Sequence, residues 1–116
     1  MTPAELAEAN IARIFNEPDA AARRAAISEL YAADAEFADP DGTATGHDAF
    51  ADSVTALLGR SPQWRFRVEG PVSAVGDLAI VHWGFGPADG DAVVHGQDVV
   101  IARDGLITRL YTLVGP

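Results

Sequence analysis

Apolar side chains recur at helical spacing near the start of the chain. Thr2-Pro3-Ala4-Glu5 has the pattern of a capping box with proline at the first helical position, so a helix is predicted to begin there. Pro18 is predicted to end or interrupt this helix, because proline cannot continue the helical hydrogen bonds. The apolar stripe of this helix consists of Leu6, Ile11, Ile14 and Phe15.

A second amphipathic helix is predicted from about Asp19. Its buried stripe is Ile27, Leu30 and Tyr31, which follow one another at the spacing of one helical face. The charged residues of this segment are predicted to face mostly water, and they are Arg23, Arg24 and Glu29.

A third helix is predicted after a short extended piece at 36–38 and a turn at Asp41-Gly42. Thr45 is predicted to cap this helix, because threonine side chains accept hydrogen bonds from backbone N–H groups at helix starts. Its apolar stripe consists of Phe50, Val54, Leu57 and Leu58.

From Trp64 onward the hydrophobic period changes from helical to two. Trp64, Phe66 and Val68 alternate with charged neighbours, as in a half-buried strand. Further strands are predicted over 73–85 or 78–85, then 92–103 and 106–114. Turn sequences separate these runs, namely Gly76-Asp77, Asp89-Gly90 and Asp104-Gly105. The order of elements predicts an α+β fold in which three N-terminal helices cover one face of an antiparallel sheet.

The opposite face of this sheet carries a mixture of aliphatic, aromatic and guanidinium groups. Alternation assigns to it Arg65, Arg67, His82, His95, Gln97, Val99, Ile101, Arg103, Arg109 and Tyr111. Such a mixture is more typical of an interface than of a purely solvated surface, so we predict a homodimer through the sheet.

Asp98 lies within an apolar strand and shares its predicted face with Val94, Gly96 and Val100. A carboxylate there must be hydrogen-bonded, paired, protonated or directed into a cavity, since an unpaired buried charge is costly. A partner such as Arg103 or Arg109 is one alternative, although parity places Arg103 on the other face.

A second acid, Asp39, follows a short apolar segment and precedes proline. Two acids at apolar strand positions suggest a pocket. The alternative for Asp39 is a turn-forming role, because aspartate before proline and close to Asp41-Gly42 is common in turns.

Composition narrows the partners that the protein could have. The 116 residues include 8 basic and 17 acidic side chains, and the net charge of −9 disfavours nucleic acid. No apolar stretch reaches the roughly 20 residues of a membrane span, so no membrane association is expected. The N-terminus lacks the pattern of a secretory signal and there is no cysteine, which predicts a cytoplasmic protein. Three histidines without metal-binding spacing lead us to expect no metal, and we expect no other cofactor.

The segment Tyr31-Ala32-Ala33-Asp34-Ala35-Glu36-Phe37-Ala38-Asp39-Pro40, followed by Gly46 and Gly70-Pro71-Val72, resembles the nuclear transport factor 2-like superfamily, in its SnoaL-like and ketosteroid isomerase-like branch. The resemblance covers nearly the whole chain, so residues 1–116 are expected to form a single SnoaL-like domain. It implies a cone-shaped, cystatin-like α+β fold, usually dimeric, with an apolar pocket between the helices and a curved sheet.

The same resemblance implies roles for individual residues. Asp39 matches the general base of ketosteroid isomerases, and Asp98 matches the protonated acid that those enzymes use to hold an enolate oxygen. Tyr31 matches a supporting tyrosine of the pocket. Two other tyrosines of the family are replaced, one by Ile14 or Phe15 and one by Val54.

Two functional hypotheses follow. In the first, the pocket accepts a small apolar carbonyl compound, Asp39 moves a proton and Asp98 steadies the oxygen, as in an isomerase, cyclase or dehydratase. In the second, the same fold is a non-catalytic ligand-binding or dimerising accessory protein, as the replaced tyrosines suggest. A third route, epoxide hydrolysis, needs an Asp-Arg-Asp constellation, and no arginine is evident on the pocket face. The residues expected to line the pocket are Phe15, Tyr31, Val54, Val81, Trp83, Phe85 and Leu110.

Overall fold

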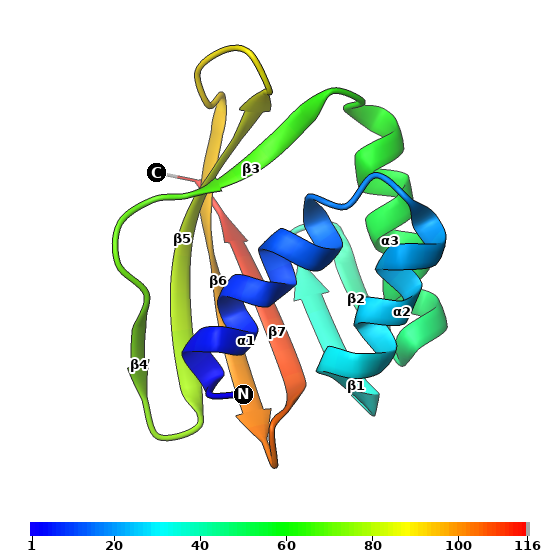
Figure 1. Cartoon of the computed structure of the whole chain (residues 1–116), viewed down its shortest axis with the longest axis vertical. Helices are drawn as coiled ribbons and strands as arrows, with labels where there is room; N and C mark the ends of the chain where they lie inside the picture. The colour runs from blue at the N-terminus through cyan, green and yellow to red at the C-terminus, as the bar shows by residue number, and fades with distance from the viewer. Residues whose placement is uncertain (116) are drawn as a thin grey trace.

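The fold is an α+β arrangement of helices on one face of a curved sheet (Figure 1). The structure is a computed structural model and describes residues 1–115. Its helical elements are α1 (Pro3–Asn10), the π-helical turn η1 (Ile11–Phe15), α2 (Ala20–Leu30) and α3 (His47–Arg60). Its strands are β1 (Tyr31–Asp39), β2 (Gly42–Thr45), β3 (Trp64–Val68), β4 (Ser73–Val75), β5 (Leu78–Pro87), β6 (Val94–Arg103) and β7 (Leu106–Val114).

The predicted first helix is confirmed, with its last turn widened into η1. The side chain of Thr2 accepts from the backbone N–H of Glu5, and the Glu5 carboxylate accepts from the backbone N–H of Thr2, which is the predicted capping box. The helix ends before Pro18, as expected. Leu6 and Ile14 are fully buried, so the predicted stripe is the face that packs on the sheet.

The sheet has the order β2-β1-β7-β6-β5-β3, and β4 also pairs with β5. The predicted hairpins of β5 with β6 and of β6 with β7 are antiparallel. The sheet as a whole is mixed, however, because β1 pairs with β7 in parallel, which corrects the prediction of a wholly antiparallel sheet. Several elements separate β1 from β7, and such a long connection lets two parallel strands lie side by side.

Three local predictions in the N-terminal half were wrong. The helix α2 ends at Leu30, so Tyr31 starts β1, which is nine residues long rather than three. Thr45 still pairs with Glu36 in β2, and the residue preceding α3 is Gly46, with φ 87° and no capping side chain. Arg23 is buried instead of solvated. Its guanidinium donates to the carbonyl oxygens of Glu17 and Pro18 and to the Thr55 hydroxyl.

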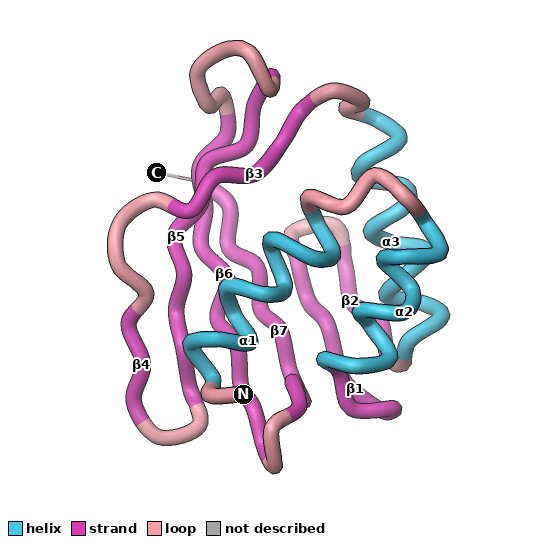
Figure 2. Tube along the Cα trace, viewed as in Figure 1, coloured by secondary structure: helices cyan, strands magenta, loops and turns pink. Residues whose placement is uncertain are grey.

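The helices cover one face of the sheet and leave the other open (Figure 2). The helix α1 packs on β5 and β6, and α2 packs against α3. The core between the layers contains Ile27, Val81, Val100 and Leu110, all fully buried. On the open face, His82 and Tyr111 are exposed, as the alternation predicted. None of the helices within residues 1–115 is long and apolar enough to cross a membrane.

Two polar side chains, those of Tyr31 and Asn10, form a hydrogen bond inside the core. The Tyr31 hydroxyl donates to Asn10 Oδ1 over 2.6 Å, and both side chains are buried. Asn10 Nδ2 has no hydrogen-bond partner within the described residues. The bond from Tyr31 is therefore the single side-chain hydrogen bond of Asn10 among these residues. The bond links the end of α1 to the start of β1.

Replacing Tyr31 with phenylalanine should therefore leave the amide of Asn10 without any partner. We expect Tyr31→Phe to lower the free energy of unfolding by about 1–3 kcal/mol, the cost of an unsatisfied buried polar group. Urea unfolding measures the change. Tyr111→Phe is the matched control, because the Tyr111 side chain is 38% exposed and its loss should change the free energy of unfolding by less than about 0.5 kcal/mol. Equal effects of the two substitutions would contradict this account.

Candidate functional site

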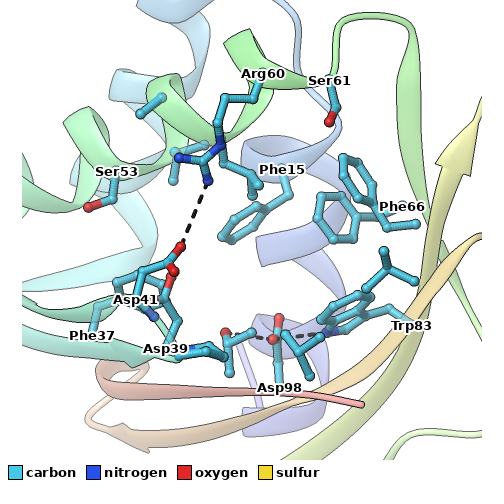
Figure 3. Close-up of a pocket in the computed structure, with 18 of the residues that line it drawn as sticks. Phe15, Phe37, Asp39, Asp41, Ser53, Arg60, Ser61, Phe66, Trp83 and Asp98 are labelled. Carbon is cyan, nitrogen blue, oxygen red and sulfur yellow. Dashed lines mark hydrogen bonds and ion pairs between the residues drawn. The ribbon is translucent and has the colours of Figure 1, made fainter. Parts of the chain in front are cut away.

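A cavity of about 720 Å³ lies between the helices and the inner face of the sheet (Figure 3). Its size is within the range of small-molecule sites, about 300–1,000 Å³. Six aromatic side chains contribute to the lining, and they are Phe15, Phe37, Trp64, Phe66, Trp83 and Phe85. The charged residues in the lining are Asp39, Asp41, Arg60 and Asp98. The cavity is thus mainly apolar, with a few charged groups at defined places.

Asp98 reaches this cavity from the middle of β6. Strand register places Thr112 of β7 directly opposite it on one side and Val81 of β5 opposite it on the other. The Thr112 hydroxyl donates to Asp98 Oδ1 over 2.8 Å, and the indole Nε1–H of Trp83 donates to the same oxygen over 3.0 Å. Asp98 is only 4% exposed, so it is a buried acid with two fixed donors.

Gly96 makes room for the indole that holds Asp98. Trp83 lies opposite Gly96 in the β5–β6 ladder, and its ring covers the glycine. A Cβ atom at residue 96 would lie 2.5 Å from the nearest ring atom of Trp83 and 2.3 Å from the carbonyl oxygen of Leu113. A side chain at residue 96 would therefore displace the indole ring of Trp83. The hydrogen bond from Trp83 to Asp98 thus requires glycine at this position.

The two donors decide which oxygen of Asp98 faces a ligand. Both bond to Oδ1, and the second oxygen points into the cavity (Figure 3). When Asp98 is protonated, the proton belongs on Oδ2, since Oδ1 is already an acceptor twice. A protonated Asp98 thus presents an O–H donor to the cavity, and an ionised Asp98 presents an acceptor.

Burial raises the pKa of Asp98 from 3.8 to about 6, and the hydrogen bonds from Thr112 and Trp83 oppose the rise because they stabilise the carboxylate. The arginines proposed as alternative partners are elsewhere. Arg103 is 3.8 Å from Asp77, and Arg109 is 3.7 Å from Glu36. Asp98 therefore has no cationic neighbour among the described ion pairs, and both of its protonation states are accessible near neutral pH.

Asp39 lines the same cavity from the end of β1. Its Oδ1 accepts from the backbone N–H groups of Asp41 (2.9 Å) and Gly42 (3.1 Å), which fixes the turn into β2. The turn-forming role considered for Asp39 is thus present together with its place at the cavity. Asp39 and Asp98, 59 positions apart in the sequence, belong to one lining.

Arg60 also lines the cavity, although the sequence showed no arginine on the pocket face. It lies at the end of α3, and its guanidinium is 3.9 Å from the carboxylate of Asp41 across the rim (Figure 3). Both side chains are well exposed, at 64% and 83%, so this ion pair contributes little to stability. Arg60 is thus an exposed residue at the rim. Epoxide hydrolysis would instead need an arginine between two acids around a water molecule.

Four of the residues expected in the lining are there: Phe15, Val54, Trp83 and Phe85. Three others are not, since Tyr31, Val81 and Leu110 are packed in the core outside the cavity. Val81 and Leu110 are fully buried, and they belong to strands β5 and β7, against which α1 packs. Phe37, Phe66 and Thr112 also line the cavity and were not predicted to do so. Alternation already separated Phe66 from its outward neighbours, but where the cavity lies depends on how the helices pack on the sheet.

Within residues 1–115, no group of three or more acidic or histidine side chains is placed to hold a metal ion.

Comparison with known proteins relates this architecture to one family. A profile of the SnoaL-like domain family matches residues 9–110. A SnoaL-like family protein from Agrobacterium tumefaciens, described as an isomerase candidate, is 25% identical with a TM-score of 0.91, and the match covers 98% of this chain and 97% of that chain.

Two more distant structures share the fold. A ketosteroid isomerase candidate from Kribbella flavida is 20% identical with a TM-score of 0.74, over 98% of this chain and 78% of that chain. A polyketide cyclase candidate from Sinorhizobium meliloti is 20% identical with a TM-score of 0.74, over 93% of each chain. No curated protein matches the sequence.

The raised pKa of Asp98 predicts how stability changes with pH. A folded-state pKa of about 6 against 3.8 means that the native state binds this proton more tightly than the unfolded state. Stability from this group is therefore complete below about pH 3.8 and is lost as pH rises to about 6, by about 3 kcal/mol in total. We expect Asp98→Asn to be more stable than the wild type at about pH 8, with the advantage shrinking toward about pH 4.

Denaturant unfolding of both proteins across this pH range measures the difference. Asparagine keeps an acceptor oxygen for Thr112 and Trp83, so the comparison isolates the charge. A pH-independent difference between the two proteins would show that the folded-state pKa of Asp98 is not raised.

Proposed function

The chain belongs to the SnoaL-like domain family and has its cone-shaped α+β fold, and from this premise we propose that it binds a small apolar carbonyl compound and transfers a proton on it. An isomerase, cyclase or dehydratase would each use such a step. The observation that carries the proposal is the buried Asp98, which offers one free oxygen to an aromatic cavity that Asp39 also lines.

Asp98 takes the role of hydrogen-bond donor to the carbonyl oxygen of the ligand. Its proton lies on Oδ2, because Thr112 and Trp83 occupy Oδ1. A neutral carboxyl group that donates to a developing enolate stabilises negative charge without a cation nearby. A ligand that excludes water from the aromatic lining strengthens this hydrogen bond, because the local dielectric falls.

Asp39 takes the role of proton acceptor. It is an acceptor in both of the hydrogen bonds that hold it, so its carboxylate stays oriented by the turn while a ligand enters. Asp39 removes the proton next to the carbonyl group and becomes a neutral acid. The electron pair of the C–H bond forms the C=C bond of an enolate, and the π pair of the carbonyl group moves to the oxygen, which Asp98 holds by a hydrogen bond. Returning the proton to another carbon completes an isomerisation.

A specific observation favours a second candidate, a non-catalytic binding protein. Phe15 and Val54 line the cavity where the family resemblance implies tyrosines. Thr112 and Trp83, which lie close to Asp98, already donate their hydrogen bonds to its carboxyl group and are not free to donate to a ligand. The loss of one oxyanion donor commonly costs about a hundredfold or more in rate, so a cavity of this kind could retain binding without useful turnover.

Proton exchange separates the two candidates without knowledge of the natural substrate. The probe is 2-tetralone in D₂O, whose acidic α-hydrogens exchange at a rate that proton NMR follows. The wild-type protein should accelerate this exchange, and Asp39→Asn should lower the acceleration roughly a hundredfold, as expected for loss of a general base. The matched control is Asp41→Asn, the same chemical change two positions away on the rim, which should leave the rate nearly unchanged.

The role of Asp98 has its own signature in the same assay. The accelerated rate should fall as pH rises above about 6, because the donor ionises. Asp98→Asn should keep part of the acceleration and lose this pH dependence, since an amide N–H still donates into the cavity. Asp98→Leu should lose the acceleration. If Asp98→Asn is as inactive as Asp98→Leu, Asp98 acts as the base instead, and if no variant differs from the wild type, the binding-protein candidate is correct.

We also propose that two copies associate through the open face of the sheet. This proposal is supported by partly or well exposed apolar side chains there, such as Tyr111 (38%) and Leu113 (49%). Two polar contacts lie on this face: the Arg109 guanidinium is 3.7 Å from the Glu36 carboxylate, and His95 Nδ1 is 2.9 Å from the Glu69 carboxylate. Exposed apolar and aromatic side chains beside arginines are residue types typical of an interface between proteins.

Sedimentation equilibrium tests this association directly. The wild-type protein should sediment as a dimer at micromolar concentration, and raising the salt concentration should change the equilibrium little, because the contact is mainly apolar. A monomer at these concentrations would overturn the proposed dimer. The cytoplasmic location, the lack of a cofactor and the lack of nucleic-acid partners stay predictions, the first supported by the absence of cysteine.

A further inference from the structure

Polar side chains line the cavity at two separated places. Asp98 and Thr112 lie at the floor, in the middle of the sheet. Asp41 and Arg60 lie at the rim, where the β1–β2 turn approaches the end of α3. Figure 3 shows Arg60 on the side of the cavity opposite Asp98. A ligand that fills the space between them would therefore meet polar groups at both of its ends.

The rim pair of Asp41 and Arg60 has hydrogen-bonding capacity to offer a ligand. Arg60 Nη2 is 3.9 Å from Asp41 Oδ2. This distance is longer than a hydrogen bond, for which about 2.7–3.2 Å is usual, so the two groups attract each other without using a donor or an acceptor. The N–H groups of the guanidinium and the oxygens of the carboxylate are thus available to a third group placed beside both.

The charges around the rim act against an ionised ligand group. Among the described residues that line the cavity, three are acidic and Arg60 is the only basic one. A ligand carboxylate at Arg60 would lie close to Asp41, on a chain whose net charge is −9. A ligand ammonium group at Asp41 would lie close to the Arg60 guanidinium. A neutral group that both accepts and donates hydrogen bonds avoids both repulsions.

Resting on the proposed place of a carbonyl group at Asp98, we propose that the ligand has a neutral carboxamide at its other end and that this group bridges the rim pair. Arg60 donates to the amide oxygen, and Asp41 accepts from the amide N–H. The aromatic lining holds the apolar body between the two ends. Because 2-tetralone has no such group, its proton exchange does not draw on the rim pair.

The test compares three compounds that share one bicyclic body: 2-naphthol, 6-hydroxy-2-naphthamide and 6-hydroxy-2-naphthoate. Calorimetry near pH 7 measures the affinity of each. The wild-type protein should bind the amide about tenfold more tightly than 2-naphthol, because the amide adds hydrogen bonds to two charged groups. The carboxylate should bind about fivefold less tightly than the amide, as expected for two like charges about 4 Å apart in water.

Variants of the rim pair separate its two halves. Arg60→Met should remove the advantage of the amide over 2-naphthol. Asp41→Asn should reverse the order of amide and carboxylate, because Arg60 keeps its charge while the opposing charge is lost. Arg103→Met and Asp77→Asn are the matched controls, since they form an exposed ion pair of 3.8 Å and do not line the cavity. Both controls should keep the wild-type order.

Equal wild-type affinity for the amide and 2-naphthol would overturn the inference, and so would a carboxylate that binds most tightly to the wild type. The same change of order in the control variants would also overturn it, because the effect would then come from net charge. If none of the three compounds binds, the inference is wrong, and the exchange of 2-tetralone still decides the proposed function. An amide advantage that depends on Arg60 in a protein without exchange activity supports the inference together with the binding-protein candidate.

Discussion

The structure depends most on how the sheet accommodates the buried carboxyl group of Asp98. An acid at 4% exposure is tolerable only because Thr112 and Trp83 donate to one of its oxygens. Gly96 is needed for the same reason, since the indole of Trp83 lies where a side chain at this position would be. The acid destabilises the fold at neutral pH, which is the cost of keeping an ionisable group at the floor of an aromatic cavity.

Much of this arrangement follows from the sequence, because alternation along a strand needs no knowledge of its neighbours. The inward face of Asp98 and the outward face of His82 were predictable on this basis. The boundary of α2 was not, because Tyr31 fits a helical stripe as well as it fits a strand. Buried apolar positions next to such a boundary satisfy both periods, and only tertiary pairing with β7 decides between them.

The partner of Asp98 was beyond prediction for a different reason. Counting back from the Asp104-Gly105 turn in a regular hairpin would place Tyr111 opposite Asp98. The observed ladder shifts by one residue between Ile101 and Ala102, and this irregularity brings Thr112 opposite Asp98 instead. A single bulged residue thus turns Tyr111 outward and brings the Thr112 hydroxyl to the inward face beside Asp98. Arg60 was missed because its approach to the cavity depends on where α3 ends relative to the β1–β2 turn.

The central claim is that Asp98 is a buried acid whose proton is available near neutral pH, and the most direct test is its own titration. The carboxyl carbon of Asp98 can be followed by carbon-13 NMR in protein labelled at aspartate, with Asp98→Asn to assign the signal. The account predicts a midpoint at about pH 6, far above the ordinary 3.8. A midpoint at or below 3.8 would contradict it, because Asp98 would then be a permanently charged group that cannot donate to a ligand.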